Sequence, residues 1–144
     1  MGLSITKPEA IMPMSRISLL KGKSPEYLAA LSHSLHRAMV EAFNVPEKDR
    51  FQLIQQHEPH ELVFDRDYES PAGPRSNDFV LINITTGKPR STEMKQAFYR
   101  RLVELLAEAP GLRPQDVMVV LSSSQGDDWS FSGGAPAASL WRPA

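Results

Sequence analysis

Two basic side chains, Lys88 and Arg90, stand just before Ser91, which opens a predicted helix. The helix dipole makes positive charge unfavourable at this end of a helix. The pair can be read as solvated surface charges, but its unfavourable position favours a binding role.

Pro13 opens the first predicted strand, a position where proline is tolerated for purely structural reasons. Chemistry arises there only if the proline is amino-terminal. A terminal proline is a secondary amine that gains and loses a proton, whereas an internal proline nitrogen is an amide without useful basicity.

Other patterns that could carry chemistry are incomplete. The Gly-Lys-Ser sequence at 22–24 resembles the end of a phosphate-binding loop, but Ile17 stands where the upstream glycine is required. The absence of cysteine excludes disulfides, thiol nucleophiles and cysteine-ligated zinc. Two histidine pairs lack a third ligand, so no metal is expected: His33 with His36, and His57 with His60.

Length and composition indicate one globular domain. The chain has 144 residues, of which 41% are hydrophobic and 23% charged. A net charge of −1 offers no surface for nucleic acid or an anionic membrane. No apolar run is long enough to span a bilayer, and residues 1–12 lack the features of a signal peptide. We therefore expect a cytoplasmic protein with neither nucleic-acid nor membrane partners.

An internal repeat organises the chain. Each copy consists of a strand, a Gly-Lys turn, a helix, a turn with proline and aspartate, and a second strand. Strands are predicted at Met14–Leu20, Phe51–His57, Phe79–Thr85 and Val117–Ser122. The first helix is framed by Ser24, Pro25 and Pro46, and the second by Ser91, Gly111 and Pro114.

The repeat predicts an α/β (α+β) fold of two β-α-β units, forming a four-stranded sheet with two helices on one face. Consecutive apolar residues at 79–82 and 117–121 suggest strands buried on both faces. Since two helices cover only one face, we expect an oligomer. The connection at 58–77 is long enough to suggest a function of its own, with a possible short strand at 62–64.

Several segments, taken in order, carry a resemblance to a known family. They are Met12-Pro13, Asp49-Arg50-Phe51-Gln52, Lys88-Pro89-Arg90-Ser91, Phe98-Tyr99 and Asp127-Asp128-Trp129-Ser130-Phe131. This order resembles the malonate semialdehyde decarboxylase group of the tautomerase superfamily and covers residues 12 to about 133.

The resemblance implies a homotrimer that uses no metal and no organic cofactor. Pro13 matches the catalytic amino-terminal proline, and Asp49 matches an aspartate that orients or activates water or the reacting group. Arg90 matches one of two arginines that hold the substrate carboxylate, and Trp129 and Phe131 match aromatic residues of the pocket. Lys88 replaces the second arginine, which keeps the charge but loses the two-pronged grip on a carboxylate.

The implied function is that of a cofactor-independent enzyme acting on a small oxo- or unsaturated carboxylate. The leading reactions are decarboxylation of a compound like malonate semialdehyde and keto–enol tautomerisation. The alternative is a non-catalytic trimeric binding or scaffold protein that retains the fold. This alternative is motivated by Lys88 and by the peptide bond that precedes Pro13.

The expected organisation is an N-terminal extension at 1–12, a single domain at 13–134 and a C-terminal tail at 135–144. Residues 1–11 show neither a helix nor a strand pattern. Since Met12 precedes Pro13, we predict that the native protein begins at Pro13. The tail is expected to pack on a neighbouring chain through Leu140 and Trp141.

Overall fold

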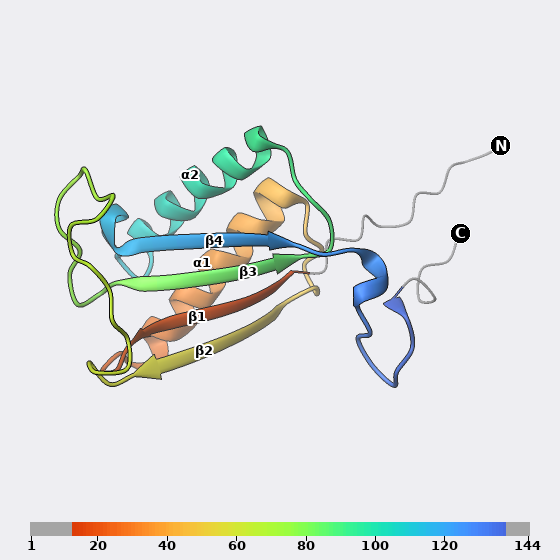
Figure 1. Ribbon diagram of the computed structural model, residues 1–144, viewed down its shortest axis with the longest axis horizontal. Coiled ribbons are helices and arrows are strands. Elements are labelled where there is room, and N and C mark those ends of the chain that lie inside the picture. The colour runs from red at the N-terminus through yellow and green to blue at the C-terminus, as the bar shows by residue number, and fades with distance from the viewer. Residues whose placement is uncertain (1–12, 138–144) are drawn as a thin grey trace.

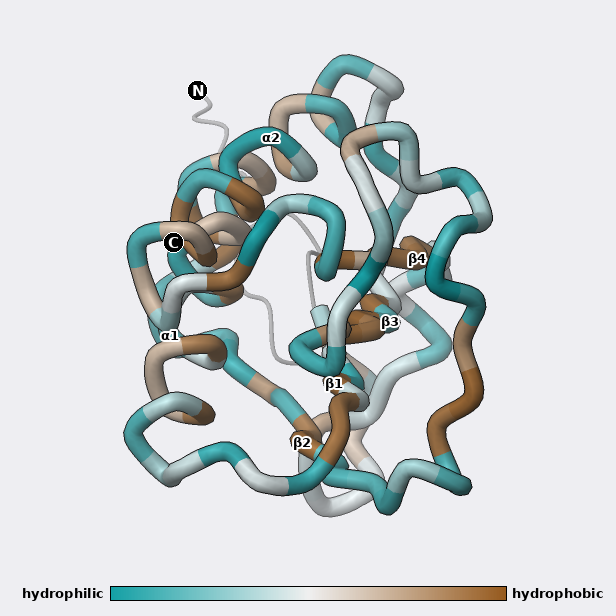
Figure 2. Tube along the Cα trace, turned by 90° about the vertical axis from the view of Figure 1, so that its left-hand side faces the viewer, coloured by the Kyte–Doolittle hydropathy of each residue, from teal (hydrophilic) through white to brown (hydrophobic). Residues whose placement is uncertain are grey.

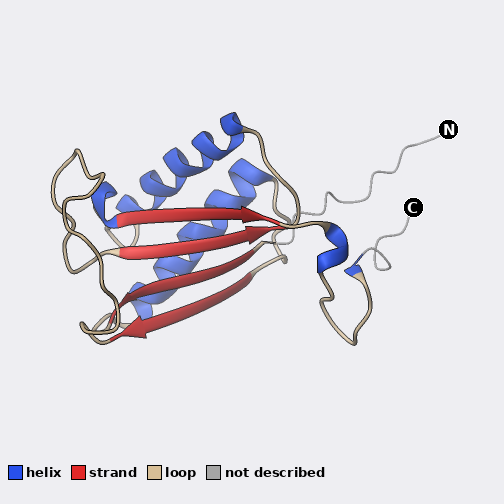
Figure 3. Cartoon of the chain, viewed as in Figure 1, coloured by secondary structure: helices blue, strands red, loops and turns tan. Residues whose placement is uncertain are grey.

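Four strands form one mixed sheet, and two long helices cover one of its faces (Figures 1 and 3). The computed structural model describes residues 13–137. The strands are β1 (Met14–Leu20), β2 (Phe51–His57), β3 (Val80–Thr86) and β4 (Val117–Ser123), and the helices are α1 (Pro25–Phe43) and α2 (Thr92–Glu108). The predicted fold class is confirmed, and β3 lies one residue later than the sequence pattern indicated.

The strand order is β2-β1-β3-β4. Within each β-α-β unit the two strands run parallel, and the units join through the antiparallel pair β1 and β3. Met14 is paired with Phe51 on one side and with Thr85 on the other. Consequently β1 and β2 begin at the end of the sheet where β3 and β4 finish.

Both helices begin at serine caps. The Ser24 hydroxyl accepts a hydrogen bond from the Tyr27 backbone N–H at 3.1 Å, and Ser91 does the same for Met94 at 3.1 Å. Helix α2 ends at Glu108, before the predicted Gly111, because the residue preceding Pro110 is driven out of the helical region.

The hydrophobic core lies between the helices and one face of the sheet. Phe43 of α1 stacks on Phe98 of α2 with ring centroids 4.6 Å apart. The strand residues on this face are 0–1% exposed, namely Ile17, Leu19, Val80, Ile82 and Ile84. Alternate strand positions therefore supply one half of the core, and the helix stripes supply the other.

The second face of the sheet is open in the single chain, and Figure 2 shows hydrophobic positions along its strands. Five large apolar side chains on this face are 37–48% exposed: Met14, Phe51, Leu53, Met118 and Val120. A contiguous apolar surface of this kind is typical of an interaction site.

The long connection between β2 and β3 contains no strand, so the predicted strand at 62–64 is wrong. Phe64 is instead held by its side chain, which stacks on Phe79 with ring centroids 4.2 Å apart, and its backbone is in a loop. Buried Asp116 anchors the end of the connection by accepting hydrogen bonds from the Ser76 backbone N–H at 2.6 Å and hydroxyl at 2.7 Å. The extension at 1–12 and the tail residues Leu140 and Trp141 lie outside the described residues.

Candidate functional site

The topology brings the sequence-predicted site residues to one end of the sheet, on the right in Figure 1. Pro13 directly precedes β1, and Asp49 lies two residues before β2. Arg90 follows β3, and the segment from Ser124 to Phe131 follows β4. Four stretches that are distant in the sequence therefore meet at one end of the sheet.

Pro13 is buried at this end of the sheet. It directly precedes Met14, which pairs with Thr85 near the end of β3. Strand alternation assigns Pro13 to the same face as Ser15 and Ile17, which is the face covered by the helices.

Arg90 turns back into the protein and is only 8% exposed. Its Nη1 donates to the carbonyl oxygen of Lys88 at 2.8 Å, and its guanidinium carbon lies 5.4 Å from the centroid of the Phe43 ring. Its second amino nitrogen, Nη2, is buried and has no hydrogen-bond partner among the described residues. Burial lowers the pKa of Arg90, although a guanidinium remains protonated in proteins.

A small cavity of about 70 Å³ adjoins the Arg90 side chain. The ends of β3 and β4, the first turn of α2 and the end of α1 enclose it. Its lining includes Phe43, Thr86, Arg90, Lys95, Leu121 and Ser123. An unpartnered cationic nitrogen in such a cavity is suited to a small anion, because a buried charge is costly until it is paired.

Lys88, the predicted second cation, does not line this cavity. It is half-buried in the turn after β3. The hydroxyl of Thr86 donates to the Lys88 carbonyl oxygen at 2.8 Å, so both Thr86 and Arg90 hold the backbone of this turn. Sequence analysis missed Lys95, which is a third basic residue at the positive end of α2.

The aromatic residues form a cluster on the same edge. Trp129 and Phe131 stack with centroids 5.7 Å apart, and Phe131 lies 5.7 Å from Phe51. The indole Nε1 of Trp129 donates to the Ser124 hydroxyl at 2.6 Å, and that hydroxyl donates to the Thr86 carbonyl oxygen at 2.7 Å. These two bonds fix the segment after β4 to the end of β3.

Asp49 is half-buried in the turn that leads into β2. Its backbone N–H donates to the Pro46 carbonyl oxygen at 3.0 Å. The adjacent Arg50 donates from Nη2 to the Ser32 hydroxyl at 2.8 Å, which ties the turn to α1. Like Lys88, Asp49 lies at the correct end of the sheet but does not line the Arg90 cavity.

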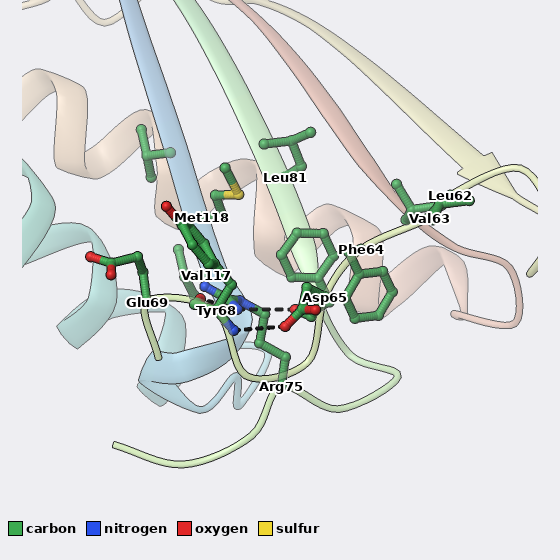
Figure 4. A pocket seen from close by; sticks show the side chains of 12 residues that line it. Leu62, Val63, Phe64, Asp65, Tyr68, Glu69, Arg75, Leu81, Val117 and Met118 are labelled. Carbon is green, nitrogen blue, oxygen red and sulfur yellow. Dashed lines mark hydrogen bonds between the residues drawn. The ribbon is translucent and has the colours of Figure 1, made fainter. Parts of the chain in front are cut away.

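A much larger hollow, of about 620 Å³, lies at the opposite end of the sheet (Figure 4). It opens on the uncovered face, and its walls include Leu81 and Met118. Its one arginine, Arg75, is occupied by the backbone carbonyl oxygens of Asp65 at 3.0 Å and Tyr68 at 2.6 Å. Apolar side chains make up most of its walls, so it is better understood as part of the open apolar face.

Residues 13–137 contain neither a candidate metal cluster nor a helix that could span a membrane. Within that range, no three or more histidine, aspartate or glutamate side chains gather so as to hold a metal ion. No helix of the same range combines the length and hydrophobicity needed to cross a bilayer.

Family models and curated relatives identify the class of protein. Two family models, both described as tautomerase enzyme, match residues 49–132 and residues 13–67. A probable tautomerase of Bacillus subtilis, YusQ, is 37% identical over 123 residues, covering 85% of this chain and 95% of the relative. The chain therefore belongs to the tautomerase superfamily.

Two solved structures of malonate semialdehyde decarboxylases are similar to this chain in fold and sequence. A malonate semialdehyde decarboxylase, described with decarboxylase and hydratase activities, is 36% identical, with a TM-score of 0.79 over 85% of this chain and 93% of that one. A second malonate semialdehyde decarboxylase, inhibited by 3-bromopropiolate, is 29% identical, with a TM-score of 0.80 over 88% and 95%. Both a tautomerase and a decarboxylase thus stand at similar identity to this chain.

Proposed function

We propose that this protein is a cofactor-independent enzyme that acts on a small oxo- or unsaturated carboxylate. The observation that carries the proposal is the buried Arg90, which lines a small cavity and whose Nη2 has no hydrogen-bond partner among the described residues. A substrate carboxylate in that cavity would supply the missing acceptor and neutralise the buried charge. The neighbour of Pro13, Met14, pairs with Thr85, which precedes the cavity residue Thr86, so Pro13 and the cavity share one end of the sheet.

In the proposed mechanism Pro13 handles the proton. Once Met12 has been removed, the Pro13 nitrogen is a secondary amine that acts as an acid when protonated and as a base when neutral. In keto–enol tautomerisation, the amine takes a proton from the enol oxygen and a proton is delivered to the neighbouring carbon.

Decarboxylation uses the same groups in a different sequence. In malonate semialdehyde, the bond between the carboxylate carbon and the central carbon breaks, and its electron pair moves toward the aldehyde oxygen. The Pro13 ammonium stabilises the enolate and its proton is delivered to the central carbon, which yields carbon dioxide and acetaldehyde. Asp49 would orient the reacting group or water, and Trp129 and Phe131 would wall the outer part of the pocket.

The comparisons and the site do not favour decarboxylation over tautomerisation. The family models bear the word tautomerase, whereas the structures at 36% and 29% identity are decarboxylases. Both reactions need a carboxylate clamp and a proton-handling proline at the same place. We therefore propose the substrate class, with Arg90 as the basic residue that receives its carboxylate; Lys88, in the same turn, does not line the cavity.

Self-association completes the proposal. The open sheet face exposes apolar side chains that an enzyme in solution would be expected to cover. We propose a homotrimer, the assembly that the family resemblance implies. A non-catalytic binding protein with the same fold and assembly is the second candidate, because Pro13 cannot act as a base while its nitrogen is an amide.

Steady-state kinetics distinguish these two candidates. Protein expressed from Met12 is assayed with malonate semialdehyde and with phenylenolpyruvate, beside a matched Pro13→Ala variant. Turnover of at least one compound, lost or strongly reduced in Pro13→Ala, is expected. No turnover of either above the Pro13→Ala level would favour the non-catalytic candidate.

A further inference from the structure

Lys95 shares the small cavity with Arg90. It lies in the first turn of α2, is half-buried, and has its backbone N–H bonded to the Ser91 carbonyl oxygen at 3.0 Å. Within residues 13–137 no carboxylate forms an ion pair with its ammonium group. The exposed Glu93, in the same turn, does not pair with it either.

The buried charge of Arg90 is unfavourable until an anion pairs with it. Lys95 stands at the positive end of the α2 dipole. A second positive charge, the almost fully buried Arg90, lines the same cavity of about 70 Å³. A bound anion in this space would neutralise the buried Arg90 charge and would be attracted by the Lys95 ammonium as well.

We propose that Lys95, rather than Lys88, is the second cationic contact of the substrate carboxylate, acting together with Arg90. The proposal rests on the function proposed above and assigns a further residue to the same site. Lys88 belongs to the turn whose backbone is held by Thr86 and Arg90, whereas Lys95 lines the cavity itself.

Lysine gives this clamp a different geometry from a pair of arginines. An ammonium group is a point charge with three rotatable donors, and it contacts one carboxylate oxygen without fixing the plane of the group. Arg90 Nη1 donates to the carbonyl oxygens of Lys88 at 2.8 Å and Pro89 at 3.4 Å, which leaves Nη2 for the ligand. Binding therefore relies on charge from two sides more than on a two-pronged grip.

The test uses propanoate as a probe and propanamide as its uncharged analogue, with protein that begins at Pro13. Four variants are compared: Lys95→Met, Lys88→Met, Arg90→Met and Arg100→Met. Methionine keeps most of the side-chain volume and the helix propensity while removing the charge. Arg100→Met provides the matched control, because this substitution removes an equal charge from the exposed surface of the same helix.

Two quantities are measured at constant ionic strength: the inhibition constant of propanoate against turnover, and the rise in Tm that saturating propanoate produces. Lys95→Met should raise the inhibition constant about tenfold or more, as expected for loss of a charge-assisted contact, and should reduce the Tm rise. Lys95→Arg should restore both. Propanamide should bind equally weakly to all forms, and Arg100→Met should behave like the unmodified protein.

The outcomes separate this proposal from the proposed function. If Arg90→Met and Lys88→Met weaken propanoate binding while Lys95→Met does not, Lys95 is not part of the clamp and the enzyme proposal stands. If neither Arg90→Met nor Lys95→Met changes propanoate binding, the cavity is not the carboxylate site. Should Lys95→Met fold poorly by circular dichroism, Lys95→Gln is measured in its place, and an unchanged propanoate Tm rise there overturns the proposal.

Discussion

The guanidinium of Arg90 lies over the ring of Phe43, with its central carbon 5.4 Å from the ring centroid. Phe43 in turn stacks on Phe98 of α2, so Arg90 is positioned by the core of the protein. A buried cation held this way is oriented before any ligand arrives. Little conformational entropy then remains to be lost when an anion binds.

Replacing Arg90 should therefore impair substrate use more than it impairs folding. We expect Arg90→Ala to lower kcat/KM roughly tenfold or more, on the order of 1.5–3 kcal/mol for a lost charge-assisted hydrogen bond. Some stability is lost as well, because the ring of Phe43 is left uncovered. Arg90→Lys, which keeps the charge, should recover part of kcat/KM, and unchanged kinetics in Arg90→Ala would remove this residue from the clamp.

A second prediction concerns the link between Trp129 and the sheet. Trp129→Phe keeps an aromatic ring beside Phe131 but removes the N–H that bonds Ser124 at 2.6 Å. We expect destabilisation of about 1 kcal/mol and faster amide exchange in residues 124–131. A double-mutant cycle with Ser124→Ala measures the pair. Additive effects of the two substitutions would mean that this bond does not hold the segment.

The open sheet face allows a third prediction, about assembly. Met118 is 43% exposed on the edge strand β4 of this face, so Met118→Glu should leave the fold of one chain intact and dissociate the assembly. Multi-angle light scattering should give a trimer mass for the unmodified protein and a smaller mass for the variant. Ala107→Glu, on the exposed side of α2, is the control and should remain trimeric.

A monomer mass for the unmodified protein at micromolar concentration would contradict the proposed assembly. The hollow beside Met118 in Figure 4 would then be a surface groove that stays open to solvent in the working protein.

Sequence patterns predicted the elements well because local physics determines them. The bounds of β1 and β2 were predicted correctly, and the caps Ser24 and Ser91 mark the helix starts. The segment at 62–64 was misjudged because its apolar residues pack as a loop. There, stacking of Phe64 on Phe79 depends on two stretches that only the tertiary fold brings together.

The site was predicted less completely. The strand order explains why Pro13, Asp49, Arg90 and the segment after β4 lie at one end of the sheet. The sequence repeat did not predict this order, because it does not specify how the two β-α-β units join. The sequence could not predict which basic side chain lines the cavity. Lys88 and Arg90 lie in a turn, and a turn has no periodic pattern from which side-chain directions can be predicted. The dipole argument applied to Lys88 applies equally to Lys95 and was the available signal.

The last prediction concerns the Pro13 amine, on which all the proposed chemistry depends. In the chain that includes Met12, the nitrogen of Pro13 is an amide and carries no exchangeable proton. We expect protein that begins at Pro13 to be active and the full-length form to be folded but nearly inactive. Steady-state assays of both forms, with circular dichroism to compare their folds, provide the measurement. Intact-mass analysis of the protein from its own cells should give a chain that starts at Pro13. If that mass instead includes residues 1–12 and the long form turns over substrate at the full rate, Pro13 is not the proton-handling group, and another residue near the Arg90 cavity must perform that role.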